Sequence, residues 1–326
     1  MALGTALADA LADSAPLVGT ALAPVPEGAA AEWFKGANGA RLRGALFFPT
    51  RLPRGSVIVS PGRTEAIEKY FEVAERLTAR GFVVLVHDWR GQGLADRLLP
   101  DRLLGHATGH ADFLSDYRAL INSFEARLPR PWIALGHSMG GCLTLLAMAQ
   151  GQVGISAAIL SAPMLGLRTG SVPRPVARLL ASVSTALGRG GRPTPGSGAS
   201  APTPFEANVL THDRARYERN EAQITAHPDL KLGGPTWGWL KFAFSATEIL
   251  ARGAGVPTLA TPVTVVAAGD DRLVDNDSLG AVTARLRRGR YIEIPGAYHE
   301  ILQETDDVQA VFWREFDALA DQVTPD

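Results

Sequence analysis

Short apolar runs alternate with amphipathic stretches over most of the chain. The runs rich in Val, Ile and Leu, which are typical of buried strands, are 57–60, 82–86, 132–135, 157–160, 262–267 and 290–294. The stretches with helical spacing of apolar residues are 65–80, 113–128, 139–150, 279–288 and 306–320. This alternation predicts an α/β fold, with a mostly parallel, doubly wound sheet and helices on both faces. Residues 32–48 add a predicted hairpin around Asn38-Gly39.

The middle of the chain breaks this rhythm. Strand–helix alternation stops at about residue 163 and resumes after 256, and residues 188–204 are crowded with Gly, Pro, Ser and Thr, as in a flexible loop. We interpret 163–256 as a helical cap, inserted after the strand at 157–160 and lying over the carboxyl edge of the sheet. Residues 32–162 and 257–326 then form the two parts of one core. Residues 1–31 are expected to form a flexible tail.

The charge balance excludes one class of partner and divides the chain in two. The 326 residues carry 32 Lys+Arg against 33 Asp+Glu, with 46% hydrophobic residues, which is typical of a soluble globular protein and gives no support for nucleic-acid binding. The cap alone carries 11 Lys+Arg against 6 Asp+Glu, and the remainder carries 21 against 27. A basic cap would attract an anionic substrate or surface, although an ordinary solvated face also explains the excess.

Signals for membrane insertion or secretion are lacking in the sequence pattern. No apolar stretch approaches the roughly 20 residues of a membrane span. The first basic residue is Lys35, whereas a secretory signal begins with a positive charge. The single cysteine, Cys142, allows no intrachain disulfide and fits a reducing compartment. We therefore expect a cytoplasmic protein, while peripheral contact of the cap with the inner membrane face and the oligomeric state stay open.

Residues 136–140 spell G-x-S-x-G between a predicted strand and a predicted helix. In this context the motif is typical of a nucleophilic serine on a tight turn, and the nucleophile would be Ser138. Glycine at 136 and 140 avoids clashes of Cβ atoms in such a turn. The turn would present the Ser138 hydroxyl above the sheet at a helix N-terminus, where developing negative charge is stabilised.

A serine hydroxyl needs a base and an orienting acid, which follow it in this architecture in the order Ser, Asp, His. His299 comes directly after the last predicted strand and is the expected base. Asp271, which follows the strand at 262–267, is the expected acid, with Asp270 as its alternative. The neighbouring Asp275 and Asp277 are interpreted as helix caps or turn residues.

Acyl transfer also needs two N–H donors for the oxyanion. The backbone amide of Met139 should supply one, and the loop after the strand at 57–60 should supply the other, from Arg63. The Arg63 side chain has two readings. It would pair with Glu65 or Asp88, which we favour because most arginine–carboxylate pairs near loops are positional, or it would meet a substrate phosphate.

These segments together resemble the α/β-hydrolase superfamily and, within it, the group of bacterial lysophospholipases and monoacylglycerol lipases. The resemblance extends over roughly residues 32–320. The segments that carry it are Pro61-Gly-Arg-Thr-Glu65, His87-Asp-Trp-Arg-Gly-Gln-Gly93, His137-Ser-Met-Gly-Gly141, Asn208-Val-Leu-Thr-His-Asp213, Asp271-Arg-Leu-Val-Asp275 and Gly296-Ala-Tyr-His299. The segment from Gly105 to Asp116 aligns only loosely, which leaves the roles of His106 and His110 open.

The resemblance implies a serine hydrolase that cleaves esters of lysophospholipids or monoacylglycerols, with no metal and no cofactor. The cap would then form an apolar groove for the acyl chain, and its expected lining is Trp237, Trp239, Leu240, Phe242 and Phe244. Simple packing of these side chains inside the cap is an equal alternative. Rival functions on the same scaffold are a serine aminopeptidase or iminopeptidase, a thioesterase or a lactonase. A catalytically silent scaffold would require loss of a triad residue, and none is missing.

Overall fold

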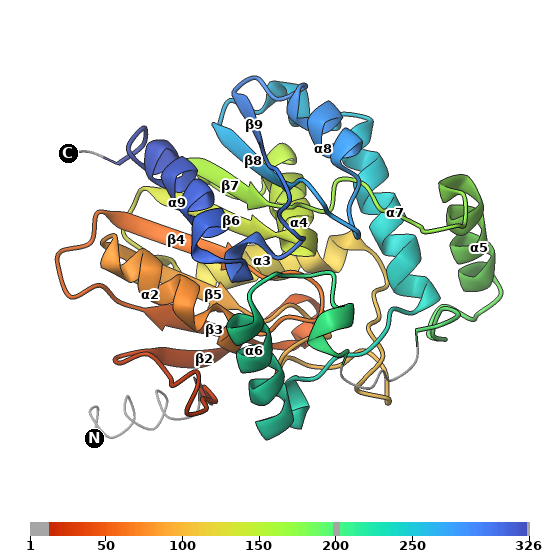
Figure 1. Ribbon diagram of the computed structural model, residues 1–326, viewed down its shortest axis with the longest axis horizontal. Helices are drawn as coiled ribbons and strands as arrows, with labels where there is room; N and C mark the ends of the chain where they lie inside the picture. The colour runs from red at the N-terminus through yellow and green to blue at the C-terminus, as the bar shows by residue number, and fades with distance from the viewer. Residues whose placement is uncertain (1–12, 198–202, 325–326) are drawn as a thin grey trace.

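The computed structural model describes residues 13–197 and 203–324, which form one mixed sheet between two layers of helices (Figure 1). The strand order is β1-β2-β3-β5-β4-β6-β7-β8-β9. The strands are β1 (Ser14–Ala15), β2 (Ala30–Lys35), β3 (Arg41–Phe47), β4 (Gly55–Ser60), β5 (Phe82–His87), β6 (Trp132–His137), β7 (Ala157–Ser161), β8 (Val263–Ala268) and β9 (Gly289–Ile294). The predicted α/β class and mostly parallel sheet are confirmed.

The sheet is antiparallel at one edge and parallel elsewhere. The predicted hairpin is β2–β3, in which Lys35 pairs with Arg41 across a short turn and Asn38 adopts a left-handed conformation. β3 also pairs antiparallel with β5, and every pairing from β5 through β9 is parallel. The carboxyl ends of the parallel strands therefore share one edge, and the loops that follow β4, β6, β8 and β9 meet there.

Alternate residues of the buried strands face opposite layers. On β4, Val57 and Val59 pack on one face while Ile58 packs on the other. Helices α2 (Phe71–Ala79) and α9 (Asp306–Ala320) cover the first face. Helices α3 (His110–Phe124), α4 (Ser138–Ala149) and α8 (Asn276–Thr283) cover the second. The sequence placed α8 three residues too late and extended it over residues 284–288, which lie outside the helix.

The described part of the expected N-terminal tail is not a tail. β1 adds to the sheet edge beside β2, and Ala15 is buried. The carbonyl oxygen of Pro16 accepts a hydrogen bond from Arg43 at 2.7 Å, and the carbonyl oxygen of Val18 accepts one from the cap residue Gln223 at 3.1 Å. Residues 13–31 therefore join the edge strand to the cap, whereas residues 1–12 of the predicted tail lie outside the described residues.

In its described residues, the segment expected as a cap has three α-helices, α5 (Arg174–Ala186), α6 (Arg214–Ala226) and α7 (Trp237–Ala251). In Figure 1, α5 stands apart at one side and α6 lies near the N-terminal segment. α7 differs from both, because its inner face, including Phe242 and Leu250, is part of the main hydrophobic core. α7 therefore packs with the core, although it lies within the segment that the sequence analysis interprets as a cap.

The Gly/Pro-rich stretch is ordered over its first half. The amide of Thr194 donates to the carbonyl oxygen of Pro235 at 3.0 Å, and the amide of Trp237 donates to Arg192 at 3.1 Å. The remainder of the predicted loop, at 198–202, lies outside the described residues. Within 13–197 and 203–324, no helix has both the length and the apolar character needed to cross a bilayer.

Candidate active site

Ser138 lies on a strained turn between β6 and α4. Its φ is 49°, a left-handed conformation that is costly for a residue with a side chain. A Cβ atom at position 140 would collide with the backbone carbonyl oxygens of Ser60 and Pro61, and one at position 136 would lie 2.7 Å from the Cα of Gly141. The close approach of backbone to backbone explains both glycines of the motif and fixes the height of the serine above the sheet.

The structure brings Ser138, His299 and Asp271 together from three loops. His299 Nε2 lies 2.9 Å from Ser138 Oγ, and His299 Nδ1 lies 2.7 Å from Asp271 Oδ2. The other oxygen of Asp271 accepts the amides of Leu273 and Val274 at 2.8 and 3.0 Å. Burial opposes ionisation of Asp271, but its bonds to His299 and to these amides lower its pKa below the usual range.

The neighbouring aspartates occupy other positions. Asp270 is exposed, whereas Asp271 is buried and in contact with the histidine. Asp275 stands at the N-cap of α8, where its carboxylate accepts the hydroxyl of Ser278, and Asp277 lies in the first turn of that helix. Of the carboxylates in this segment, Asp271 is therefore the one in a position to orient His299.

Two backbone amides are placed near the serine. Met139 follows Ser138 at the start of α4, where N–H groups have no partner within the helix. In the described parts of the chain, no acceptor bonds the amide of Arg63. Arg63 and Met139 both line the cavity that contains Ser138 and His299. The positions of both amides agree with the expected oxyanion-binding role, which stays a prediction.

A buried polar cluster lies beneath the serine turn. Glu65 accepts the hydroxyl of Tyr70 at 2.6 Å and the ammonium of Lys69 at 2.9 Å, and Lys69 also pairs with Glu300, next to His299. Burial alone would raise the pKa of Glu65, but Lys69, His137 and these hydrogen bonds lower it to about 2. The cluster connects the loop after β4 to the loop that carries His299. Motif spacing gave no sign of it beyond the short interval from Glu65 to Lys69.

The guanidinium of Arg63 does not pair as the sequence suggested. Glu65 is taken by Lys69 and Tyr70, and Asp88 pairs with Arg43 at 2.8 Å. Arg63 instead donates through Nη2 to the carbonyl oxygen of Gly233 and lies over the ring of Trp239, with its carbon 5.1 Å from the ring centroid. Its Nε is buried without a partner among the described residues. The favoured pairing with Glu65 or Asp88 was therefore wrong.

A cavity of about 650 Å³ opens above Ser138. Of the expected lining residues, Trp237, Trp239 and Leu240 do contact it. The other two do not: Phe242 packs in the core against Phe113, with ring centroids 5.0 Å apart, and Phe244 packs against α5. Both face away because α7 is covered on two sides, and only its N-terminal turn reaches the cavity. The apolar wall is completed by residues that the sequence analysis did not select: Met164, Leu167, Val172, Ala177, Leu180, Leu210 and Val274.

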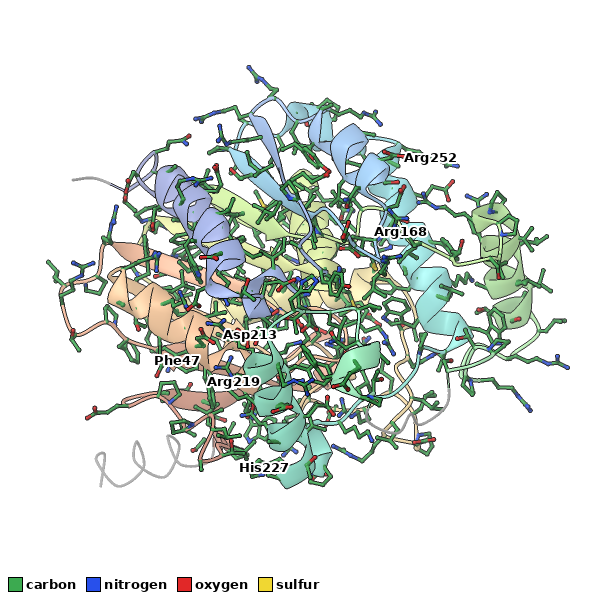
Figure 2. All side chains as sticks on the ribbon, viewed as in Figure 1. Phe47, Arg168, Asp213, Arg219, His227 and Arg252 are labelled. Atoms are coloured by element: carbon green, nitrogen blue, oxygen red, sulfur yellow. The ribbon has the colours of Figure 1, made fainter. Side chains whose placement is uncertain are left out.

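A second cavity of about 570 Å³ adjoins the first. Its lining comes mainly from α6 and the loops on either side of it, and it is rich in polar residues. Arg63, Thr64, Leu210 and Glu300 line both cavities, so the two meet beside the loop after β4. On the far side of the first cavity, Arg168 lines the wall between β7 and α5 (Figure 2).

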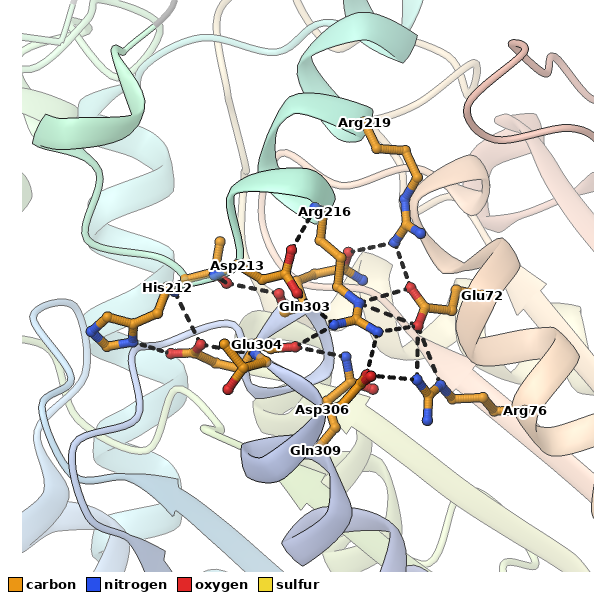
Figure 3. Close-up of polar contacts among 12 residues, drawn as sticks. Glu72, Arg76, His212, Asp213, Arg216, Arg219, Gln303, Glu304, Asp306 and Gln309 are labelled. Carbon is orange, nitrogen blue, oxygen red and sulfur yellow. Dashed lines mark hydrogen bonds and ion pairs between the residues drawn. The ribbon is translucent and has the colours of Figure 1, made fainter.

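A network of ion pairs fastens α6 to the core (Figure 3). Arg216 pairs with Glu72 of α2 at 2.6 Å and with Asp306 of α9 at 2.7 Å, and Arg219 pairs with Glu72 at 2.7 Å. Although burial opposes ionisation of Glu72, the two arginines lower its pKa to about 2. From this anchored end, near Asp213, α6 extends away to His227 (Figure 2).

Glu304 ties the loop of the candidate base to the cap. It is fully buried, and its two oxygens accept the amide of Tyr298 at 2.8 Å and the amide of His212 at 3.0 Å. The His212 ring also lies 2.8 Å from Glu304 and stacks on Tyr298, with centroids 3.8 Å apart. The segment 208–213, noted in the sequence for its resemblance to related caps, therefore contacts the residue next to His299. The sequence analysis did not single out Glu304.

The two histidines whose roles were left open do not line the cavity that contains Ser138. His106 Nδ1 is 2.8 Å from the hydroxyl of Thr236, where residues 105–107 meet the start of α7. His110 is the first residue of α3. Burial lowers the pKa of both. The hydrogen bond between His106 and Thr236 therefore connects the loop before α3 to the start of α7.

Comparison with known proteins agrees with this geometry. The family model described as serine aminopeptidase, S33, matches residues 51–306. Lysophospholipase L2 of Escherichia coli (strain K12) is 37% identical over 267 residues, which cover 78% of this chain and 77% of that protein. Monoacylglycerol lipase of Mycolicibacterium smegmatis is 27% identical, over 84% of this chain and 91% of its own length.

The fold is also that of solved lipases. A soluble variant of monoglyceride lipase from Saccharomyces cerevisiae matches with a TM-score of 0.74, at 20% identity, over 96% of this chain and 100% of that one. The sheet order, the serine on its turn and the family match over most of the chain agree with one another. The chain belongs to the serine aminopeptidase S33 family of α/β hydrolases and, within it, to the group of carboxylic ester hydrolases that includes lysophospholipases and monoacylglycerol lipases.

Proposed function

We propose that this protein hydrolyses the ester of a single-chain glycerolipid, a lysophospholipid or a monoacylglycerol, with Ser138 as nucleophile. The observation that carries the proposal is the continuous hydrogen-bonded line from Asp271 through His299 to Ser138, at 2.7 and 2.9 Å, at the floor of an apolar cavity. A nucleophile, a base and an orienting acid within hydrogen-bond reach are the elements that covalent acyl transfer requires.

The reaction then follows from the positions of these atoms. His299 Nε2 accepts the proton of Ser138 Oγ as that oxygen attacks the ester carbonyl carbon. The amides of Arg63 and Met139 stabilise the oxyanion. His299 returns the proton to the departing alcohol, and the acyl group stays on the serine. Water, deprotonated by His299, attacks the acyl-enzyme, and the bond from the acyl carbon to Ser138 Oγ breaks. His299 returns the proton to Ser138 Oγ and the fatty acid leaves, while Asp271 stabilises the imidazolium in both steps.

The cavity supports a lipid acyl group as the substrate. Its wall is mostly aliphatic and aromatic, and Ser138 and His299 are among the residues that line it. The relatives named lysophospholipase L2 and monoacylglycerol lipase agree with this chemistry. One apolar cavity of about 650 Å³ suits one acyl chain.

A fluorophosphonate probe tests the nucleophile. The wild type should be labelled and Ser138→Ala should not. Equal labelling of both proteins, or none of the wild type, would refute the assignment. A panel of monoacylglycerols, lysophospholipids, short p-nitrophenyl esters, acyl thioesters, lactones and aminoacyl amides tests the substrate. Turnover of the amides alone would favour the aminopeptidase alternative, and turnover of the thioesters or lactones alone would favour those activities.

The exposed face of α5 supports contact with a membrane surface. The large apolar side chains on it and just beyond its two ends follow helical spacing and are 41–67% exposed; they are Val172, Val176, Leu179, Leu180, Val183 and Leu187. Residues 163–205 contain five arginines and no Asp or Glu. Of these arginines, Arg178 pairs with Glu248 of α7 at 2.8 Å. An apolar face with an excess of positive charge beside it suits an anionic lipid surface. Leu180 also lines the cavity, so bound lipid would lie close to its mouth.

Vesicle sedimentation tests this contact. The protein should bind vesicles of phosphatidylcholine with phosphatidylglycerol more tightly than vesicles of phosphatidylcholine alone. Leu179→Ser with Leu187→Ser should reduce that binding. Leu52→Ser is the matched control, since Leu52 is 91% exposed on a different loop. Equal loss with the control, or no loss with the α5 variants, would refute the proposed surface.

A further inference from the structure

Arg63 carries a positive charge for which the described residues provide no counterion. Its guanidinium makes one hydrogen bond, to a carbonyl oxygen, and Nε has no partner. The ring of Trp239 lies beneath it and supplies attraction but no opposite charge. Burial lowers its pKa to about 10, so the group is still cationic at neutral pH. A buried, unpaired charge is costly, and an anionic ligand would remove that cost.

The position of Arg63 indicates which part of a substrate would meet it. The apolar cavity contains Ser138, and the polar cavity begins on the other side of Arg63 and Thr64. An acyl chain in the apolar cavity with its ester at Ser138 would direct the glycerol towards the polar cavity. Whatever group the glycerol carries would therefore pass the guanidinium.

The length of the Arg63 side chain matches the distance along the lipid from its ester to its phosphate, counted in covalent bonds. The number of covalent bonds from the Arg63 amide nitrogen to its guanidinium carbon equals the number from the ester carbonyl carbon to the phosphorus of a 1-acyl lysophospholipid. With the oxyanion at the Arg63 amide, the phosphate of such a lipid would be within reach of the guanidinium of the same residue. Arginine binds phosphate oxygens through charge-assisted hydrogen bonds. A monoacylglycerol has only a hydroxyl at this place.

The polar cavity also holds a carboxylate without a bound partner. Glu221 lies on α6 and lines this cavity, and its side chain has no hydrogen bond or ion pair within 4.0 Å among the described residues. The other charged side chains here differ: Glu300 is bound by Lys69, and Arg216 by Glu72. Burial raises the pKa of Glu221, although Lys231 and Lys69 oppose the rise from a greater distance. Glu221 is thus available to a ligand cation.

We propose, on the basis of the function proposed above, that the polar cavity binds the zwitterionic headgroup of a lysophospholipid, with Arg63 at the phosphodiester and Glu221 at the ammonium group. The phosphate of such a headgroup would face the guanidinium of Arg63, and its ammonium group would face the carboxylate of Glu221. Arg63 lines both cavities and Glu221 lines the polar one. Arg63 and Glu221 are then specificity-determining residues, and monoacylglycerol is a poorer substrate than a lysophospholipid with the same acyl chain.

The test compares three oleoyl lipids in mixed micelles: lysophosphatidylethanolamine, lysophosphatidylglycerol and monooleoylglycerol. Arg63→Gln, which keeps the backbone amide, should lower kcat/KM on both phospholipids by about tenfold relative to monooleoylglycerol, and Arg63→Lys should restore part of the loss. Glu221→Gln should lower kcat/KM mainly on lysophosphatidylethanolamine. The controls are Arg118→Gln, on the exposed face of α3, and Glu218→Gln, whose carboxylate pairs with Arg214 on the outside of α6.

The outcomes separate the two proposals. Equal losses on all three lipids for Arg63→Gln, or for Glu221→Gln, would overturn the headgroup site and leave the ester hydrolase intact. Hydrolysis of monooleoylglycerol without hydrolysis of either phospholipid by the wild type would do the same. Failure of the wild type on all three lipids would instead refute the proposed function. Fluorophosphonate labelling of each variant shows that its Ser138 region is folded.

Discussion

Gln92 donates its side-chain amide to the carbonyl oxygen of Gly62 at 2.8 Å. The oxygen of the same amide accepts the N–H of Thr64 at 3.2 Å, so Gln92 brackets Arg63 from both sides. Thr64 has a φ of 67°, and the indole of Trp89 holds the same loop by donating to Pro61 at 2.9 Å. The direction of the Arg63 amide is therefore set by two side chains from the loop after β5.

Replacing Gln92 tests this positioning. Gln92→Met keeps the volume of the side chain but removes both hydrogen bonds, and the freed loop should misplace one oxyanion donor. We expect kcat on a short p-nitrophenyl ester to fall by about tenfold to a hundredfold, with a smaller change in KM. Unchanged kcat in a variant with a wild-type melting temperature would contradict this role.

Asp271 and Asp270 form a matched pair for testing the acid. Asp271→Asn removes the charge that orients His299 and should lower kcat by about 10³ to 10⁴. Asp270→Asn alters an exposed neighbour and should retain most activity. Steady-state kinetics of both variants decide between the two residues. A larger loss in Asp270→Asn would reverse the assignment.

Gly140→Ala tests the packing beneath the serine turn. The new methyl group would meet the backbone carbonyl oxygens of Ser60 and Pro61, which cannot move without shifting β4. We expect loss of fluorophosphonate labelling and a lower melting temperature. Gly280→Ala is the control, because its added methyl has open space on a helix and should change stability by no more than about 1 kcal/mol, in the stabilising direction. Similar behaviour of the two variants would count against the steric argument.

Arg43 should be important for stability rather than for chemistry. It is fully buried and pairs with Glu68 at 2.7 Å and Asp88 at 2.8 Å. Arg43→Met leaves two buried carboxylates without their cation, although backbone amides still donate to both, so we expect a loss of about 3–5 kcal/mol in the free energy of unfolding. Arg54→Met, which breaks a surface pair with Asp321, should cost at most about 1 kcal/mol. Urea denaturation measures both, and equal losses would show that burial does not matter here.

The junction between α6 and the core should weaken in acid. The pKa of Glu72 is about 2 in the folded protein, against an ordinary value of 4.5. A lowered pKa gives stability that is present above about pH 4.5 and is lost as the pH falls towards 2. Urea midpoints of the wild type should therefore decline over that interval, and those of Glu72→Gln should decline less. The exposed Glu75→Gln on the same helix is the control, and a wild-type profile parallel to that of Glu72→Gln would contradict the assignment.

The sequence predicted the features that depend on local pattern and chain order. Buried strands, the glycine spacing around Ser138 and the position of His299 after the last strand all follow from short segments and the order of strands. The side-chain contacts of Arg63 could not be read in this way. Glu65 is close to Arg63 in sequence, and Asp88 follows a neighbouring strand. In the structure, however, Glu65 pairs with Lys69 and Asp88 pairs with Arg43, so neither is available to Arg63.

Two further features were not predicted: which side chains of α7 face the cavity, and the strand formed by the N-terminal segment. Both depend on contacts with residues distant in the chain. Phe242 and Phe244 follow Trp239 by three and five residues on the same apolar helix. Only contacts with α3 and α5 decide which of these side chains face the cavity. Residues 14–15 gain their structure from pairing with β2, which no local signal announces. Such features depend on partners distant in the chain.

Glu304 has a consequence for any attempt to exchange the cap. Its carboxylate holds the backbone beside His299 and the cap residue His212 at the same time. A graft that replaced residues 208–213 would leave this buried carboxylate without one of its donors and release the loop that carries the candidate base. We therefore expect replacement of the segment 208–213 to preserve the loop that carries His299 only if the Glu304 contacts are transplanted with it.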